Sequence, residues 1–145
     1  MKVLFDTNVV LDVLLAREPY AAIAAQLLSL ADRGQIEGVV CATTVTAIHY
    51  LAEKAVGRRK AEKHVREFLN IFEVAPVDHR VLTHALDTRF ADYEDAVLHE
   101  AVRAVEVGAI VTRNAKDFTE ATVPVVSPEE LLCAVLAEKP KEPAG

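Results

Sequence analysis

Short apolar runs alternate with longer amphipathic segments along the chain. Compact runs rich in Val, Leu and Ile are typical of strands that are buried on both faces of a sheet. One of these runs contains Pro76, which lacks an N–H group, so we expect that run at a sheet edge. The segments predicted as strands are Lys2–Phe5, Val39–Cys41, Glu73–Val77, Ala109–Thr112 and Thr122–Val126.

The segments between these runs carry apolar residues at helical spacing, as Ile23, Leu27 and Leu30 do. Gly34 is typical of the position just past a helix end, and Ser127-Pro128-Glu129-Glu130 is typical of a helix start. The segments predicted as helices are Val9–Leu15, Tyr20–Asp32, a stretch capped by Thr43 or Thr44 that ends near Gly57, Lys60–Phe72, a stretch capped by Asp78 that runs through Leu86, Tyr93–Val107, and a stretch that begins at Ser127.

This alternation predicts an α/β fold with a parallel sheet that is covered by helices on both faces. The chain has 145 residues, of which 52% are hydrophobic, and this suits one domain with a sizeable core. We expect that domain to cover residues 1–137. Residues 138–145 are rich in Lys, Glu and Pro and are predicted to form a disordered tail.

The composition disfavours several classes of protein. No window approaches the roughly 18 uninterrupted apolar residues of a membrane span, and the apolar run before Asp6 is too short for a signal peptide. We therefore expect a cytoplasmic protein without membrane contact. Cys41 and Cys133 match no metal-ligand spacing, and we expect free, partly buried thiols.

Acidic and amide side chains follow the predicted strands at the places where parallel α/β folds bind ligands. Such ligands lie in the crevice outside the carboxyl ends of the strands. The first and fourth predicted strands are followed by such residues, and three more acids lie at the start of the helix Tyr93–Val107. The side chains expected to converge there are Asp6, Asp92, Glu94, Asp95, Asn114 and Asp117.

Such a cluster of like charges raises the pKa values of its members, and a hard divalent cation removes that cost. Mg²⁺ and Mn²⁺ prefer oxygen ligands. Bound cations also answer the objection that a net charge of −6 disfavours a protein that binds nucleic acid. Because a metal ion can activate water and stabilise charge on phosphate oxygens, hydrolysis of a phosphodiester is the expected chemistry.

Each acid taken alone also has a purely structural explanation. Asp6 is explained as a helix N-cap, Glu94 and Asp95 as acids that the helix dipole favours, and Asp117 as a loop acid. The joint placement of the acids at one sheet edge is what favours a site. A receiver-like phosphoacceptor domain fits poorly, because no Asp follows the second predicted strand.

Three segments of the chain carry the residues of the expected site. The first segment is FDTNVVLDVL, from Phe5 to Leu14. The second is DYEDAVLHEAV, from Asp92 to Val102, and the third is IVTRNAKDF, from Ile110 to Phe118. Together these segments resemble the motifs of PIN-domain ribonucleases, in particular the bacterial branch that includes VapC-type toxins. The order and the spacing of the segments fit the family, and the resemblance covers residues 1–137.

The resemblance implies a three-layer α/β/α sandwich with a four- to five-stranded parallel sheet, and Mg²⁺- or Mn²⁺-dependent cleavage of RNA. In toxin members it also implies a homodimer and a partner antitoxin that blocks the site. It assigns Asp6, Asp95 and Asp117 as metal-binding acids, and Glu94 is our candidate for the fourth. The polar positions that it places around the site are Asn8, Thr112 and Asn114.

The chain departs from the family at one position. The second acid of the family lies in the helix after the second strand, and here that position holds His49. Imidazole ligates Mn²⁺ but suits Mg²⁺ poorly; contact with substrate phosphate and simple packing in the helix are the other interpretations. Glu53, one turn further, is an alternative acid or an exposed ion-pair partner. The departure keeps a second function open, a degenerate PIN domain that binds RNA or protein without catalysis.

Two basic features are candidates for contact with RNA. Arg58, Arg59 and Lys60 form a dense basic segment that is placed to contact an RNA backbone or, equally well, to form a solvated helix face. Arg113 follows a predicted strand, where it has the same two explanations, a phosphate contact or a surface ion pair.

Overall fold

The computed structural model describes residues 1–138. Its centre is a parallel sheet with the strand order β3-β2-β1-β4-β5. The strands are β1 (Lys2–Phe5), β2 (Glu37–Cys41), β3 (Glu73–Ala75), β4 (Ala109–Val111) and β5 (Val125–Val126). The helices are α1 (Thr7–Leu14), α2 (Ala21–Asp32), α3 (Ala42–Val56), α4 (Arg58–Ile71), α5 (His79–Leu86), α6 (Tyr93–Val105), α7 (Pro128–Ala137) and the short 3-10 helix η1 (Ala115–Phe118).

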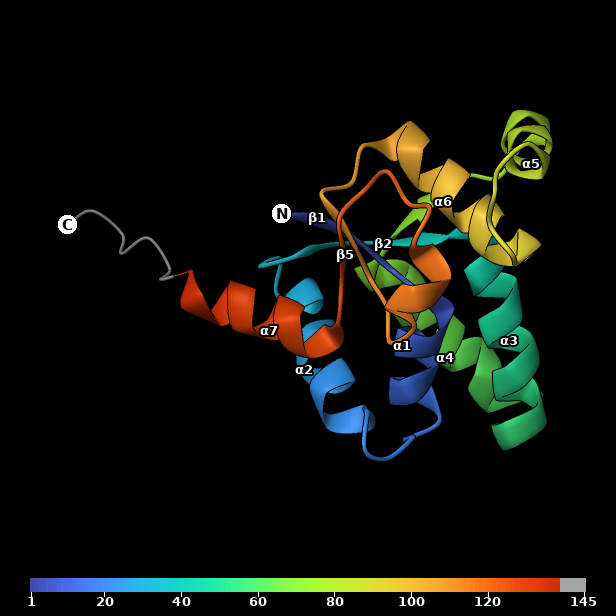
Figure 1. The fold of residues 1–145 in the computed structure, drawn as a ribbon. Coiled ribbons are helices and arrows are strands. Elements are labelled where there is room, and N and C mark those ends of the chain that lie inside the picture. The colour runs from blue at the N-terminus through green and yellow to red at the C-terminus, as the bar shows by residue number, and fades with distance from the viewer. Residues whose placement is uncertain (139–145) are drawn as a thin grey trace.

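The two faces of the sheet are covered by different helices, because side chains alternate along each strand. Val3 and Phe5 of β1 belong to a core shared with α1, α2, α4 and α7, whereas Leu4 belongs to a second core shared with α5 and α6. Figure 1 shows α5 and α6 above the sheet and the other helices below it. This arrangement confirms the predicted three-layer α/β/α sandwich.

Several predicted boundaries are wrong, each for a local reason. The last strand begins at Val125 instead of Thr122, because the N–H of Thr122 donates to His99 Nε2 instead of a strand. The third helix starts at Ala42, and neither predicted threonine caps it. Thr44 instead places its hydroxyl 2.8 Å from that of Thr7.

Other differences are smaller. α6 ends at Val105, short of the predicted Val107, because Glu106 adopts a left-handed backbone with φ of 52°. The sequence did not predict η1, which is too short to give a helical period.

Cys41 and Cys133 are both free, as expected, but Cys133 is exposed where we expected partial burial. The predicted tail lies almost entirely outside the described residues, and within residues 1–138 no helix has both the length and the apolarity to cross a membrane.

The strand order has a switch point between β1 and β4. From β1 it builds outward through β2 to β3, and it then returns to the other side of β1 to add β4 and β5. The loops that follow β1 and β4 therefore leave the same edge in opposite directions, and a crevice opens between them. Asp6 and Thr112 are the residues directly after these two strands.

A buried ion pair joins α1 to the loop after β4. Asp12 of α1 is 1% exposed, and its two oxygens accept hydrogen bonds from Arg113 Nε at 2.6 Å and Nη2 at 3.1 Å. Arg17 Nε lies 3.2 Å from the same carboxylate. The Arg113 guanidinium also lies over the ring of Tyr20, 3.9 Å from its centroid. The ion-pair explanation of Arg113 is therefore correct, except that the pair is buried and not at the surface as predicted. The loop that carries Asn114 is fixed to α1.

We expect Asp12→Ala to lower the free energy of unfolding by about 3–5 kcal/mol, because it leaves the half-buried Arg113 without its partner. Urea denaturation of both proteins measures the change. Asp32→Ala at the exposed end of α2 is the control and should change stability by less than about 0.5 kcal/mol. A loss at Asp12 no larger than that of the control would contradict the proposed importance of the pair.

Candidate active site

Asp6 is a buried carboxylate that is held from two sides at the carboxyl end of β1. Its Oδ1 accepts a hydrogen bond from the backbone N–H of Thr7 at 2.8 Å, and its Oδ2 accepts one from the hydroxyl of Thr112 at 2.8 Å. That hydroxyl in turn accepts from the N–H of Asn114 at 3.0 Å. The helix-cap explanation is therefore correct for one oxygen, while the other oxygen connects α1 to the loop after β4.

The first turn of α6 and the turn η1 bring further acids to this edge. Asp92 is the N-cap of α6, and its Oδ1 accepts hydrogen bonds from the N–H groups of Glu94 at 2.8 Å and Asp95 at 3.3 Å. The cap fixes the turn that carries these two acids. Asp117 lies in η1, where its N–H donates to the carbonyl of Asn114 at 2.9 Å.

These side chains line one cleft of about 350 Å³ at the carboxyl edge of the sheet, to which we refer as the acid cleft. It is bounded by the starts of α1 and α6, by α3 and by the turn η1, and in Figure 1 the yellow start of α6 lies close to the top of α3. The lining residues are Asp6, Thr7, Asn8, Leu11, Ala47, Leu51, Asp92, Glu94, Asp95, Leu98, Asn114 and Asp117.

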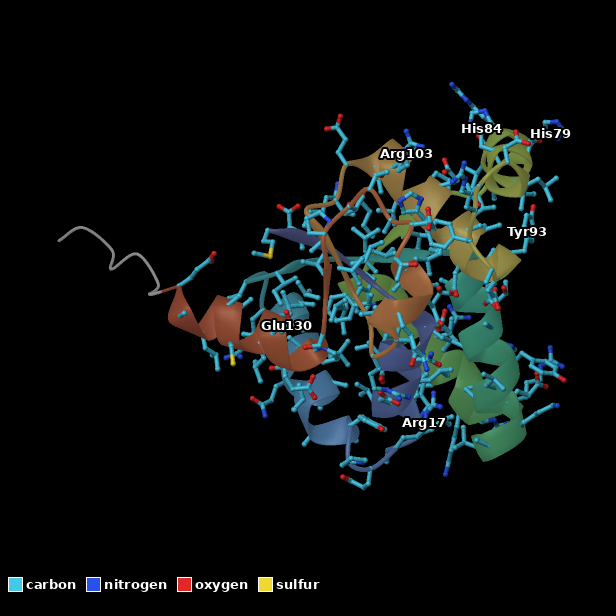
Figure 2. The ribbon with its side chains drawn as sticks, viewed as in Figure 1. Arg17, His79, His84, Tyr93, Arg103 and Glu130 are labelled. Atoms are coloured by element: carbon cyan, nitrogen blue, oxygen red, sulfur yellow. The ribbon has the colours of Figure 1, made fainter. Side chains whose placement is uncertain are left out.

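A larger cavity, of about 430 Å³, lies between α5 and α6. Figure 2 labels two of its lining residues, His84 on α5 and Arg103 in the last turn of α6, whereas Tyr93 lies at the other end of α6. The larger cavity combines basic and acidic side chains, and it does not include the residues that follow β1 and β4. The acid cleft is therefore the better candidate, because it holds the side chains that the switch in strand order brings together.

Two acids of the cleft, Asp6 and Asp95, have raised pKa values. Burial, followed by the charges of Asp6, Asp92, Asp117 and Glu94, raises the pKa of Asp95 from 3.8 to about 7. Burial also raises the pKa of Asp6, although its hydrogen bonds from Thr112 and Thr7 lower it. The cleft therefore concentrates negative charge that its own hydrogen bonds do not offset.

The donor chemistry of the cleft fits a hard divalent cation, because its wall is rich in carboxylate oxygens and lacks sulfur and imidazole. Within residues 1–138, no three acidic, histidine or cysteine side chains come close enough together to form a ready-made metal group. Mg²⁺ usually keeps several waters and needs only one or two direct carboxylates. The arrangement is therefore compatible with an ion that is held partly through water.

Not every predicted site residue lines the cleft. Asn8 and Asn114 do, whereas Thr112 lies behind Asp6 and is fully buried. His49 is absent from the lining, and its Nδ1 lies 3.8 Å from Glu53 on the same helix. The face of α3 that lines the cleft presents Ala47 and Leu51 instead. The position of the family's second acid thus contributes no ligand from α3.

The predicted basic residues also lie outside the cleft lining. Arg58 at the start of α4 pairs with Glu62 at 3.2 Å, as the solvated-face explanation expects, and neither Arg59 nor Lys60 lines the cleft. Contact of this segment with RNA stays a prediction. Sequence reasoning missed Asp12, although a lone acid inside an otherwise apolar helix is a signal that it has a buried partner.

The repulsion around Asp95 leads us to expect that Asp95→Asn stabilises the metal-free protein. The pKa of this carboxyl in the fold lies above 3.8, so its contribution to stability is lost as the pH rises toward about 7. At pH 8 in EDTA, the melting temperature should rise by roughly 2–4 °C after allowance for solvent screening. Thermal unfolding measures this shift.

Asp87→Asn, at an exposed acid that ends α5, is the matched control and should leave the melting temperature unchanged. The difference between the Asp95 variant and the original protein should shrink at pH 5, where the carboxyl is mostly protonated. A melting temperature that falls in the Asp95 variant at pH 8 would contradict the repulsion.

Comparisons with known proteins agree with this fold and with these motifs. A family model described as PIN domain matches residues 2–116. Ribonuclease VapC1 of Aquifex aeolicus is 24% identical over 135 residues, which cover 89% of this chain and 92% of that protein.

Two solved structures have the same fold. VapBC2 of Rickettsia felis, bound to a promoter DNA fragment, matches with a TM-score of 0.68 and 12% identity over 88% of this chain and 98% of that one. A toxin–antitoxin complex of Klebsiella pneumoniae matches with a TM-score of 0.65 and 22% identity over 87% of this chain and 97% of that one. Since the family model spans most of the chain and the three motifs meet at one sheet edge, this protein belongs to the PIN domain family.

Proposed function

We propose that this protein is a divalent-metal-dependent endoribonuclease that hydrolyses phosphodiester bonds of RNA in the acid cleft. The observation that carries the proposal is the convergence of Asp6, Asp95 and Asp117 in one cleft, with Glu94 beside them. Membership of the PIN family and similarity to a protein named as a ribonuclease support RNA as the substrate.

Asp6, Asp95, Asp117 and Glu94 are the acids that would hold Mg²⁺ or Mn²⁺. Such an ion, when bound, offsets the charge that grows on the phosphate oxygens and favours ionisation of the attacking water. Asp6 is the best fixed of these ligands, because both of its oxygens already accept hydrogen bonds. Glu94 is exposed at the start of α6, where its side chain is free to adjust to the ion.

The amide side chains of the cleft would orient water or substrate. Asn8 and Asn114 each offer both donors and an acceptor at the cleft wall. Thr112 acts one step further back, since its hydroxyl donates to Asp6 and leaves the carboxylate in one orientation. Because α3 presents only Ala47 and Leu51 to the cleft, we propose that Glu94 serves as the fourth metal-binding acid in place of the family's second acid.

We further propose that the protein is the toxin of a toxin–antitoxin pair, with a protein antitoxin, a homodimeric assembly and a cytoplasmic location. Similarity to structures described as toxin–antitoxin complexes supports this part of the proposal. Exposed apolar side chains on the paired helices α3 and α4, among them Tyr50, Val56 and Leu69, give a surface that suits a protein partner.

Asp6→Asn should abolish RNA cleavage while the fold stays intact. The substitution removes the buried charge, while the amide oxygen still accepts from the N–H of Thr7 and the amide NH2 can donate to the hydroxyl oxygen of Thr112. Cleavage of a fluorescent RNA by the purified variant in Mg²⁺ or Mn²⁺ measures activity, and circular dichroism checks the fold. If the protein is a toxin, growth arrest on expression should disappear in the same variant.

Asp32→Asn at the exposed end of α2 is the matched control, because it makes the same chemical change away from the cleft. The control should cleave RNA at the original rate. RNA cleavage by the Asp6 variant at the original rate, after separate purification of each protein, would refute the catalytic assignment.

A second candidate function is a PIN domain that binds RNA or protein without cutting. Two observations favour it, namely the apolar α3 wall at Ala47 and Leu51 and the lack of a ready-made metal group within residues 1–138. This candidate and the nuclease differ in their affinity for metal.

For the nuclease, we expect Mn²⁺ at millimolar concentration to raise the melting temperature, since a ligand that binds only the folded state stabilises it. The shift should be lost in Asp95→Asn, which removes a proposed ligand, and retained in Asp87→Asn. Differential scanning fluorimetry with and without EDTA measures both shifts. The absence of any Mn²⁺ effect on the unsubstituted protein would favour the non-catalytic candidate.

A further inference from the structure

A second hollow, of about 230 Å³, adjoins the acid cleft. The two hollows share Asp92, Asp95 and Asp117, so they open onto the same acids from different sides. The remaining wall of the second hollow, to which we refer as the cationic lobe, is formed by Arg89, Phe90, Ala91, Lys116, Thr119 and Glu120.

The charge of the cationic lobe differs from that of the acid cleft. No basic side chain lines the acid cleft, whereas the cationic lobe has Arg89 and Lys116. Arg113 and Arg103, by contrast, are paired with Asp12 and Glu100 at distances of 2.6 and 3.4 Å. Within the part of the chain that the structure describes, no ion pair holds Arg89 or Lys116, and both residues are exposed. Their charges are therefore available to a ligand.

The backbone that carries these two cations is well anchored. Phe90, next to Arg89, packs against the rings of His99 and Phe118 at centroid distances of 5.0 and 6.0 Å. Phe118 is itself buried at the end of η1, the turn that holds Lys116. One aromatic cluster thus fixes the two cationic segments relative to each other and to the acids beside them.

This alternation of charge suits a chain of phosphate groups. A phosphate at the acid cleft depends on metal ions there to offset the carboxylates, but the next phosphate of a nucleic-acid strand lies beyond those ions. That neighbouring phosphate needs positive charge from the protein itself, and guanidinium and ammonium groups are the side chains that supply it. Arg89 and Lys116 are the guanidinium and ammonium groups that line the second hollow together with the three shared acids.

We propose that the cationic lobe binds the phosphate that adjoins the scissile phosphate of a single-stranded RNA, through Arg89 and Lys116. This inference rests on the proposed nuclease function and adds a substrate subsite to it. In this arrangement the two cations bind the substrate strand and take no part in the bond-breaking step. They therefore affect only substrates that extend beyond the scissile phosphate.

The test compares two substrates in Arg89→Ala/Lys116→Ala. Bis(4-nitrophenyl) phosphate contains one phosphodiester and no neighbouring phosphate, so its Mn²⁺-dependent hydrolysis should be unchanged. For a short single-stranded RNA, KM should rise about tenfold or more, because charge-assisted contacts are lost. Arg89→Lys/Lys116→Arg should restore most of the RNA affinity.

Binding is measured separately from turnover, by fluorescence anisotropy of labelled RNA in the Asp6→Asn background. Loss of one phosphate contact should reduce the slope of log affinity against log salt by about 0.7. The matched control Arg33→Ala/Arg80→Ala removes the same charge from exposed sites that line neither hollow, and it should retain the slope and the KM.

The outcomes separate the subsite from the catalytic proposal. An unchanged RNA KM and salt slope in the Arg89/Lys116 variant would overturn the subsite, as would an equal loss of activity on both substrates. If the unsubstituted protein hydrolyses neither substrate, the nuclease proposal fails. The salt slope of RNA binding then still decides whether the cationic lobe contacts phosphate.

Discussion

The position of Asp6 is the constraint on which the rest of the site depends. Its backbone N–H donates to the carbonyl of Val111, and its side chain accepts from Thr112, so β1 and β4 are joined at their carboxyl ends through one residue. The same residue caps α1. Since β1 is the central strand, its carboxyl edge is the reference from which the loops after β4 and the start of α6 are placed.

Two buried or half-buried acids show opposite solutions to the cost of burying charge. Asp12 is compensated by the guanidinium of Arg113 and is therefore a structural group. Asp95 has acids for neighbours, and within residues 1–138 no basic side chain forms an ion pair with it. Uncompensated acids are costly to the fold, and such groups gather where function requires them. This contrast distinguishes the carboxylates that we propose as functional from the structural one better than burial alone.

Much of this architecture was predictable from local patterns. The apolar runs predicted the strands, and their alternation with helical segments predicted the three layers. The positions of Asp6 and Asp117 after predicted strands indicated the sheet edge at which the two acids meet. The rotation of α3, which turns Ala47 and not His49 toward the cleft, depends on how its apolar face packs, and one sequence does not reveal this. The pairing of Asp12 with Arg113 could not be predicted, because the two residues are 101 positions apart in the sequence.

Adjacent residues Thr112 and Arg113 contact α1 at its start and in its second turn, through Asp6 and Asp12. Two contact points fix both the position and the direction of a helix, so α1 and the segment after β4 behave as one stiff wall. Another wall is the first turn of α6, where the hydroxyl of Tyr93 donates to the carbonyl of Leu82 in the middle of α5. A change in the width of the cleft that involves the start of α6 therefore also moves α5, while Asp6 stays in place.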